Sequence, residues 1–345
     1  MQISQKNLIS TLQELIRIPS VTGNEGTISK FVQNQLEALG LQTTHDEVGN
    51  VYCEIGKGKK SLMLNAHLDT VPAQGYKKDP YRGEKKGNKV IGLGASDCKA
   101  GLATMMEIAR ILDPKKINGK LVLAFTVAEE AVLEGGRLPK GSMYAAERYN
   151  TDGCLVLEPT MHDGVPMISA GCRGRMILEL EVKGKSTHSS RPHTGENAIE
   201  KAVKTVHHLM EHDLLTGYYF GSELPETLSI VRIASDSPAT NIIPSKCNVT
   251  VDYRTLPGRT DVKNKIKNAI KQSAKDTDIK IPYFSPGYFL NEDSKFVKFF
   301  KESVDNAFKK DVGIMIALGR ADAEYFYRNG SPAIIFGPGE NHQCH

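Results

Sequence analysis

Histidines and acids in this chain follow short apolar runs, a pattern that can build a metal-dependent hydrolytic site. His67 and Asp69 follow such a run in LMLNAHLDTVP. The adjacent acids Glu129 and Glu130 follow LVLAFTVA, and Glu158 follows CLVL. Burying adjacent carboxylates is costly unless a cation or a proton compensates their charge. Imidazole and carboxylate groups together suit zinc, with cobalt and manganese as competitors.

Each of these segments also has an ordinary structural reading. On a strand, His67 and Asp69 share a face, but an isolated HxD pair also fits a surface histidine beside a turn-capping aspartate. Asp97, in GLGASDCKAG, precedes an expected helix, so it either caps that helix or bridges two cations. Glu129 and Glu130 also fit an exposed acidic loop after a strand.

The segment AIIFGPGENHQCH supplies the last candidates. Its apolar run predicts a strand that ends in a Gly-Pro-Gly turn and leads to His342 and His345. Four strand-like segments therefore each deliver a histidine or an acid just beyond their ends. Chance rarely does this four times, so the joint pattern favours a metal site over the separate structural readings.

The elements that would position these residues alternate between helix and strand. Apolar spacing predicts helices at residues 8–16, 28–39, 295–308 and 322–327, with a further helix after Asp97. Apolar runs predict strands at 51–55, 62–68, 121–127, 154–157 and 333–336. This alternation predicts an α/β layer fold whose site lies at the carboxyl ends of the strands.

The pattern changes between residues 171 and 285. Strands are predicted at 176–182, 228–233 and 247–253, and amphipathic helices at 199–210 and 262–274. Such a unit is a small α+β domain of the ferredoxin-like kind. We therefore expect a catalytic metal-binding domain at 1–170 and 286–345, interrupted by an inserted domain at 171–285.

Composition limits the classes of partner. The 345 residues carry 44 basic and 40 acidic side chains, a net charge of +4 that does not indicate nucleic-acid binding. No apolar run approaches the roughly 20 residues of a membrane helix, and the N-terminus lacks the apolar core of a signal peptide. Six cysteines without CxxC pairing indicate reduced thiols and a cytoplasmic protein.

Together the motifs resemble the co-catalytic zinc family that contains acetylornithine deacetylase, succinyl-diaminopimelate desuccinylase, aminoacylase and carboxypeptidase G. The matching stretches follow the family's order over nearly the whole chain: AHLDTVP, GLGASDCKAG, TVAEE, LEPT, GKSTHSSRPHTGENAI, TNIIPSKCNVTVDYRTLPG and GPGENHQCH. The resemblance implies a zinc-peptidase-like α/β catalytic domain with an inserted dimerisation or lid domain. It also implies two zinc ions per chain and a homodimer formed through the inserted domain.

The same resemblance assigns the metal ligands. It places His67 and Glu158 on one metal, Glu130 and His345 on the other, and Asp97 between them. His342 is the alternative to His345. Family members usually continue past the final histidine, whereas this sequence ends there, so we expect the Glu130–His345 site to be the weaker one.

Further roles follow from the resemblance. It implies that Asp69 supports His67, that Glu129 is the general base, and that His188 stabilises the oxyanion from the lid, with His193 as its rival. Arg254 would hold a substrate carboxylate, with Asn241 as a polar contact beside it. Because the peptide after the bridging aspartate is typically cis in this family, we expect a cis bond between Asp97 and Cys98.

These features predict a di-zinc enzyme that hydrolyses the amide bond of N-acyl amino acids, a small substrate, near acetylornithine deacetylase. A metallo-carboxypeptidase or dipeptidase with the same chemistry is the first alternative. A catalytically silent homologue that acts as a binding module is the second. The presence of Glu129 and of all five presumed ligands argues against a silent protein.

Overall fold

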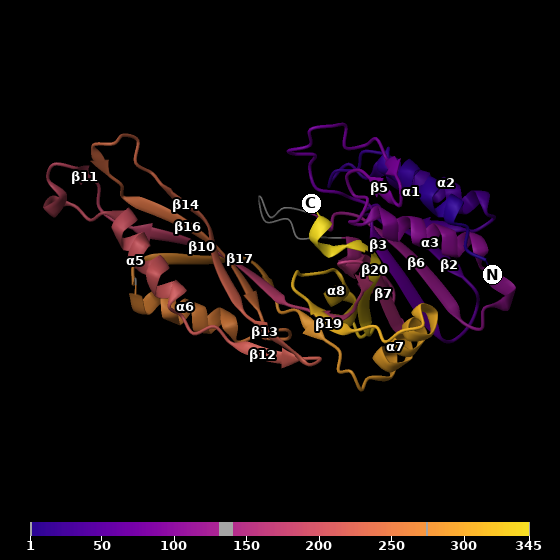
Figure 1. Ribbon diagram of the computed structural model, residues 1–345. Coiled ribbons are helices and arrows are strands. Elements are labelled where there is room, and N and C mark those ends of the chain that lie inside the picture. The colour runs from indigo at the N-terminus through magenta and orange to yellow at the C-terminus, as the bar shows by residue number, and fades with distance from the viewer. Residues whose placement is uncertain (1, 131–140, 274, 345) are drawn as a thin grey trace. The chain divides into compact units, whose positions relative to one another are not determined.

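The computed structural model describes residues 2–130, 141–273 and 275–344, and the chain divides into two compact units (Figure 1). The first unit comprises residues 1–171, 290–317 and 321–345, and the second comprises 172–289 and 318–320. Each unit has its own cluster of buried apolar side chains. The second unit therefore interrupts the first in the sequence.

The first unit is built on a mixed sheet in the order β1-β2-β6-β3-β7-β20-β9, with β8 beside β7 and β19 beside β9. Its strands are β1 (Thr43–His45), β2 (Val51–Ile55), β3 (Ser61–His67), β6 (Lys120–Thr126), β7 (Gly153–His162), β8 (Val165–Pro166), β9 (Ile168–Cys172), β19 (Ile314–Ala317) and β20 (Ala333–Glu340). β3 runs parallel to β6 and β7, and β7 runs parallel to β20. The carboxyl ends of these four strands therefore lie along one edge.

Helices cover both faces of this sheet. Those of the first unit are α1 (Gln5–Ile16), α2 (Gly26–Ala38), α3 (Lys99–Ile111), α4 (Gly141–Arg148), α7 (Lys295–Phe308) and α8 (Ala323–Arg328). α1, α2 and α3 lie on one face, and α7 and α8 lie on the other (Figure 1). Leu15, Val32 and Leu102 carry the apolar stripes of α1, α2 and α3 into the core beside Phe125 of β6. Each such buried side chain contributes about 1.5–3 kcal/mol.

The second unit follows the order β–α–β–β–α–β around a four-stranded antiparallel sheet, β14-β16-β10-β17. Its elements are β10 (Gly174–Lys183), β11 (Thr187–His188), α5 (Ala198–Met210), β12 (Thr216–Tyr219), β13 (Ser222–Pro225), β14 (Thr227–Ser235), β15 (Ile242–Ile243), β16 (Lys246–Thr255), α6 (Val262–Ser273), β17 (Thr277–Ser285) and β18 (Tyr288–Phe289). Met176, Leu178 and Leu180 alternate into the core, where residues of α5 and α6 cover them. The predicted α/β fold with an α+β unit of ferredoxin-like order is confirmed.

Two strands extend further than their apolar runs predict. β7 continues to His162, so Glu158 lies inside the strand and the prediction that it follows the strand's end is wrong. β20 continues to Glu340, so the Gly-Pro-Gly sequence that we predicted as a turn is part of a strand. The two segments are parallel partners, and Gly337 pairs with Pro159. Hydrogen bonding to a neighbouring strand thus extends both elements beyond their apolar residues.

Two further observations concern membrane-spanning helices and the cysteines. Among the described residues, none of the helices has the length and apolar character that crossing a membrane requires. The six cysteines all carry free thiols, and five of them are buried.

Candidate metal centre

His67 is the last residue of β3, and only 3% of it is exposed. It lies in parallel register with Thr126, the last residue of β6. The loop after β6 carries Glu129 and Glu130. His67, Glu129 and Glu130 each place one possible ligand atom within 4.8 Å of the others. Neighbouring parallel strands therefore bring the histidine and the paired acids to the same edge of the sheet.

Asp69 is fully buried and holds the loop that carries the paired acids. Its carboxylate accepts hydrogen bonds from the backbone N–H of Glu129 at 3.0 Å, that of Glu130 at 2.9 Å, and the hydroxyl of Thr22 at 2.7 Å. Nδ1 of His67 lies 2.9 Å from the backbone oxygen of Asp69 and 3.5 Å from its Oδ1. Burial by itself would raise the pKa of Asp69, but His67 and these donors lower that pKa below its usual range. The group stays a carboxylate.

Asp97 lies just before α3, but the residue at the helix cap position is Cys98. Oδ1 of Asp97 lies 2.9 Å from Nε2 of His67, so its carboxylate faces the histidine. The peptide bond between Asp97 and Cys98 is cis, as the resemblance predicts. The thiol of Cys98 donates to the backbone oxygen of Leu157 at 3.1 Å. This contact joins the start of α3 to β7, the strand that carries Glu158.

The carboxyl groups at this edge favour a bound cation. Oε1 of Glu158 is enclosed and has no hydrogen-bond partner among the described residues. Burial, followed by the charges of Glu129 and Asp97, raises the pKa of Glu158 well above its usual range. Burial, followed by the charge of Glu129, raises the pKa of Glu130 to about 9. A divalent metal would offset both desolvation and repulsion, so the donor set fits one.

Two residues near the N-terminus support the same loop, and sequence reasoning missed both. Thr22 donates to Asp69, as described above. Glu25 is the cap residue of α2, but its carboxylate accepts from the backbone N–H groups of Gly23 and Ala128 and not from the helix. Ala128 has φ of 61°, a left-handed conformation that needs support. No local pattern signals a contact that spans 103 positions.

The end of the chain approaches the same acids. His345 lies outside the described residues, so its role as a ligand stays a prediction. His342, the alternative ligand, is largely exposed, and its Nδ1 lies 3.6 Å from Oε2 of Glu340. Burial and then the charge of Asp97 raise the pKa of the Cys344 thiol above its usual range. The charge of Asp97 can raise this pKa only from close by, so Cys344 lies beside the carboxylate cluster.

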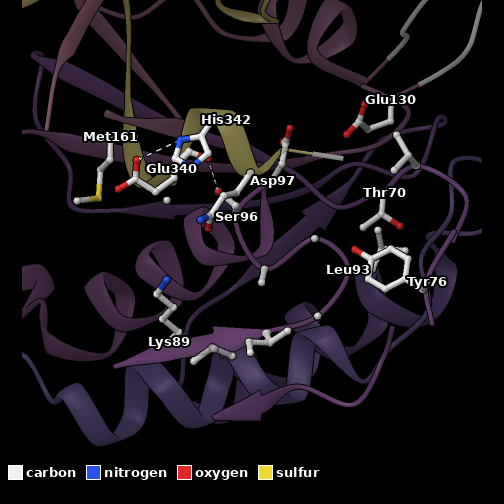
Figure 2. A pocket seen from close by; sticks show the side chains of 18 of the residues that line it. Thr70, Tyr76, Lys89, Leu93, Ser96, Asp97, Glu130, Met161, Glu340 and His342 are labelled. Carbon is white, nitrogen blue, oxygen red and sulfur yellow. Dashed lines mark hydrogen bonds and ion pairs between the residues drawn. The ribbon is translucent and has the colours of Figure 1, made fainter. Parts of the chain in front are cut away.

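A cavity of ≈ 780 Å³ opens beside these groups, and Asp97 and Glu130 form part of its wall (Figure 2). β5 (Lys89–Ile91), which forms a hairpin with β4 (Glu84–Lys86), contributes to the wall, whereas β4 does not. The other lining residues are Thr70, Val71, Tyr76, Asn88, 92–96, Met161, Asp163, Gly339, Glu340, His342 and Gln343. The cavity therefore gives a ligand access to the carboxylate cluster.

The second unit brings two predicted lid residues together. His188 ends β11, which pairs with β15, and Nε2 of His188 lies 3.5 Å from Nδ2 of Asn241. The backbone N–H of Ser190 donates to Nδ1 of His188 at 3.1 Å. A backbone N–H can only donate, so this contact fits the tautomer that carries its proton on Nε2, in which Nε2 cannot accept a hydrogen bond from Nδ2 of Asn241. His193, the rival, is exposed in a short 3-10 helix at Pro192–Thr194.

Arg254 lies on β16 and forms two hydrogen bonds with Asp252, Nε to Oδ1 at 2.8 Å and Nη2 to Oδ2 at 3.2 Å. Arg175 also binds Asp252, through Nη2 at 2.8 Å. Two guanidinium groups share one carboxylate, so the cluster carries net positive charge, and the contacts fix the orientation of Arg254.

Comparison with known proteins identifies the family. The pattern of peptidase family M20/M25/M40 matches residues 63–345. The chain belongs to this family. This M20 family member is a hydrolase of amide bonds, and its family is one of divalent-metal enzymes.

Two sequence relatives carry the name succinyl-diaminopimelate desuccinylase. A succinyl-diaminopimelate desuccinylase of Pelagibacter ubique is 28% identical over 96% of this chain and 90% of its own length. Another from Dinoroseobacter shibae is 32% identical over 71% of this chain and 67% of its own length. These names describe the relatives.

The solved structures have a wider range of names. A tripeptidase of Staphylococcus aureus matches with a TM-score of 0.77 and 25% identity, covering 98% of this chain and 91% of the other. An M20 family metallo-carboxypeptidase of Sulfolobus solfataricus matches with a TM-score of 0.77 and 18% identity, covering 95% and 90%. At 18% identity, the similarity to the carboxypeptidase shows only that the two chains share a fold.

Proposed function

We propose that this M20 family member hydrolyses the amide bond of N-acyl amino acids, as a deacylase resembling acetylornithine deacetylase and succinyl-diaminopimelate desuccinylase. The observation that carries the proposal is the carboxylate cluster around His67, in which Glu130 and Glu158 need a compensating cation. The relatives named desuccinylase support the acyl-amino-acid substrate. A peptidase of the same family is the second candidate, and the tripeptidase neighbour favours it.

We assign two zinc ions to each chain, with cobalt or manganese as substitutes. His67 and Glu158 would hold one metal, Glu130 and His345 the other, and Asp97 would bridge them. The metals would supply Lewis acidity that polarises the amide carbonyl and lowers the pKa of water. The contact between Asp97 and His67 at 2.9 Å supports their sharing of one ion.

Glu129 is the general base in this proposal. It takes a proton from the attacking water and passes it to the nitrogen that leaves as an amine. Its backbone N–H is fixed by Asp69, and its side chain lies within the cluster formed with His67 and Glu130. Both features support a base held in one place relative to the ligands.

The second unit would supply the remaining contacts. His188 would donate to the oxyanion from Nε2, in the tautomer that fits the contact of the Ser190 N–H with Nδ1. Asn241 lies beside that nitrogen and would contact the substrate from the same side. Arg254, in its ordered contact with Asp252, would bind the carboxylate of the amino-acid product.

The inserted segment 171–285 would act as a dimerisation and lid domain, and 1–170 with 286–345 as the catalytic domain. β14 is an edge strand on which Val231 and Ile233 are 58% and 51% exposed. On α5, Val203 and Met210 are 55% and 68% exposed. Exposed apolar side chains on an edge strand and helix support a homodimer at this surface. The six free cysteines support a cytoplasmic location.

The test is a substrate panel with the zinc- or cobalt-loaded protein. Release of acetate or succinate from acylated ornithine, lysine or diaminopimelate, without cleavage of dipeptides, supports the deacylase. The reverse result favours the peptidase. Less than about one zinc per chain together with silence on every amide would favour the binding homologue.

Replacement of the base gives a prediction for the mechanism. Glu129→Gln keeps the shape of the side chain but cannot accept the proton, so kcat should fall by about 10²–10⁴. Its metal content should equal that of the parent protein, measured by elemental analysis after dialysis. Activity that survives this change would show that another group is the base.

A further inference from the structure

The cavity beside the carboxylate cluster is larger than the reacting amide requires, and its wall contains groups that the mechanism does not use. Asp97 and Glu130 line it where the metal ligands gather. Away from them the wall is formed by β5 of the hairpin (Figure 2). A substrate whose amide lies at the metals can therefore extend one of its two ends into this space.

The charged groups of the wall differ in their partners. Glu340 accepts a hydrogen bond from the backbone N–H of Gly164 at 2.7 Å, and His342 lies 3.6 Å from its other oxygen. Asp163 is 81% exposed at its side chain and lies 3.4 Å from Nδ1 of His162. Oε1 of Glu340 and the carboxylate of Asp163 thus have donors nearby, whereas Oε2 of Glu340 is buried and has no hydrogen-bond partner among the described residues.

The cavity wall also contains Lys89, which differs from the acids in its ion-pair partners. Within the part of the chain that the structure describes, no ion pair joins Lys89 to a carboxylate. Figure 2 shows its side chain rising from β5 toward the part of the wall that carries Ser96. An ammonium group on a cavity wall without a protein carboxylate is suited to a ligand carboxylate.

We propose that Lys89 forms an acyl-group subsite that binds a terminal carboxylate, so that the preferred acyl groups are those of dicarboxylic acids, such as succinyl. The proposal rests on the proposed function, because it assumes that an acylated amine is the substrate. Under it, the acyl end of the substrate lies in the cavity.

The same arrangement disfavours other substrates of the family. The free N-terminus of a peptide would place an ammonium group beside the ammonium of Lys89, and like charges repel. An acetyl group has no carboxylate for Lys89 to bind, so acetylated substrates would be used without help from this residue. Under this proposal the cavity separates succinyl from acetyl and peptide substrates by charge.

Kinetics with matched substrates test the subsite. Lys89→Met removes the charge and keeps the length of the side chain, and Lys85→Met does the same on β4, outside the cavity wall. For N-succinyl-diaminopimelate, kcat/KM should fall on the order of tenfold in the Lys89 variant, the effect of one solvent-accessible charged hydrogen bond. For an N-acetyl amino acid, kcat/KM of the Lys89 variant should equal that of the parent protein. In the Lys85 variant, kcat/KM should be unchanged for both substrates. An equal loss on succinyl and acetyl substrates, or no loss, overturns the proposal.

A binding measurement separates this inference from the proposed function. Succinate and butyrate have the same chain length, but only succinate has a second carboxylate. By titration calorimetry of the zinc-loaded protein, succinate should bind about tenfold more tightly than butyrate, and Lys89→Met should abolish that difference. If the difference exists and depends on Lys89 but no acyl amino acid is hydrolysed, the subsite stands and the deacylase proposal fails. If succinate and butyrate bind alike, or Lys89→Met leaves their difference unchanged, the subsite is excluded.

Discussion

Asp69 shows how a single residue can organise a site without touching a substrate. Its carboxylate accepts from the backbone N–H groups of both Glu129 and Glu130, and its backbone oxygen lies beside the ring of His67. One buried, charged group therefore sets the position of the proposed base and of two proposed ligands. Supporting groups of this kind commonly affect metal affinity about 10–100-fold.

Asp69→Asn tests this arrangement. The amide keeps one oxygen acceptor but places an NH₂ group against a backbone N–H, so the loop should lose one of its two hydrogen bonds. We expect zinc affinity to fall by about 10–100-fold, measured by competition with a chelator. Far-ultraviolet circular dichroism should stay unchanged. An unaltered affinity would show that the loop holds its position without Asp69.

At the scale of elements, close packing of α3 on β7 decides where two proposed ligands lie. Asp97 precedes α3, and Glu158 is part of β7. Gly101 of α3 faces the backbone of β7 so closely that a Cβ at this position would lie 2.4 Å from the oxygen of Leu157. The absence of a side chain at residue 101 therefore allows the helix and the strand to approach.

Gly101→Ala should force α3 away from β7. We expect it to lower the free energy of unfolding by about 1–3 kcal/mol, as overpacking does, although alanine favours helices. It should also weaken metal binding, because Asp97 and Glu158 move apart. Urea unfolding and metal titration measure the two effects. Gly26→Ala, in α2 with no atom within 4 Å of the new Cβ, is the control and should lose neither. Equal results for the two variants would contradict the packing argument.

At the scale of the whole molecule, the second unit leaves an apolar edge uncovered. Val231 and Ile233 are exposed on β14, which among the strands that the structure describes has a sheet neighbour on one side only. An edge strand with apolar side chains is a template for pairing with another chain. This surface carries the homodimer that we propose.

Val231→Asp should convert the dimer to a monomer, because two carboxylates would be buried at a twofold interface. Light scattering coupled to size exclusion measures the mass directly. Phe299→Asp, at a side chain of α7 that is 67% exposed in the first unit, is the control and should remain dimeric. A monomeric parent protein, or a dimeric Val231 variant, would exclude this surface as the interface.

Much of the fold could be predicted because helix and strand patterns are local. α7 runs from Lys295 to Phe308, as predicted, because its apolar stripe follows the helical period and Ser294 caps its start. The position of Glu158 was predicted wrongly because the length of β7 depends on pairing with β20, which lies far away in the sequence. An apolar run does not report the hydrogen bonds of a distant neighbour.

The sequence alone determined the family, the order of the elements, and which histidines and acids could do chemistry, since these depend on residue type and spacing. Only the tertiary structure showed that Asp69, Thr22 and Glu25 hold one loop, and that Lys89 lines the cavity beside Asp97. These arrangements join residues from separate elements. They follow from how the sheet and its helices pack, which no local pattern encodes.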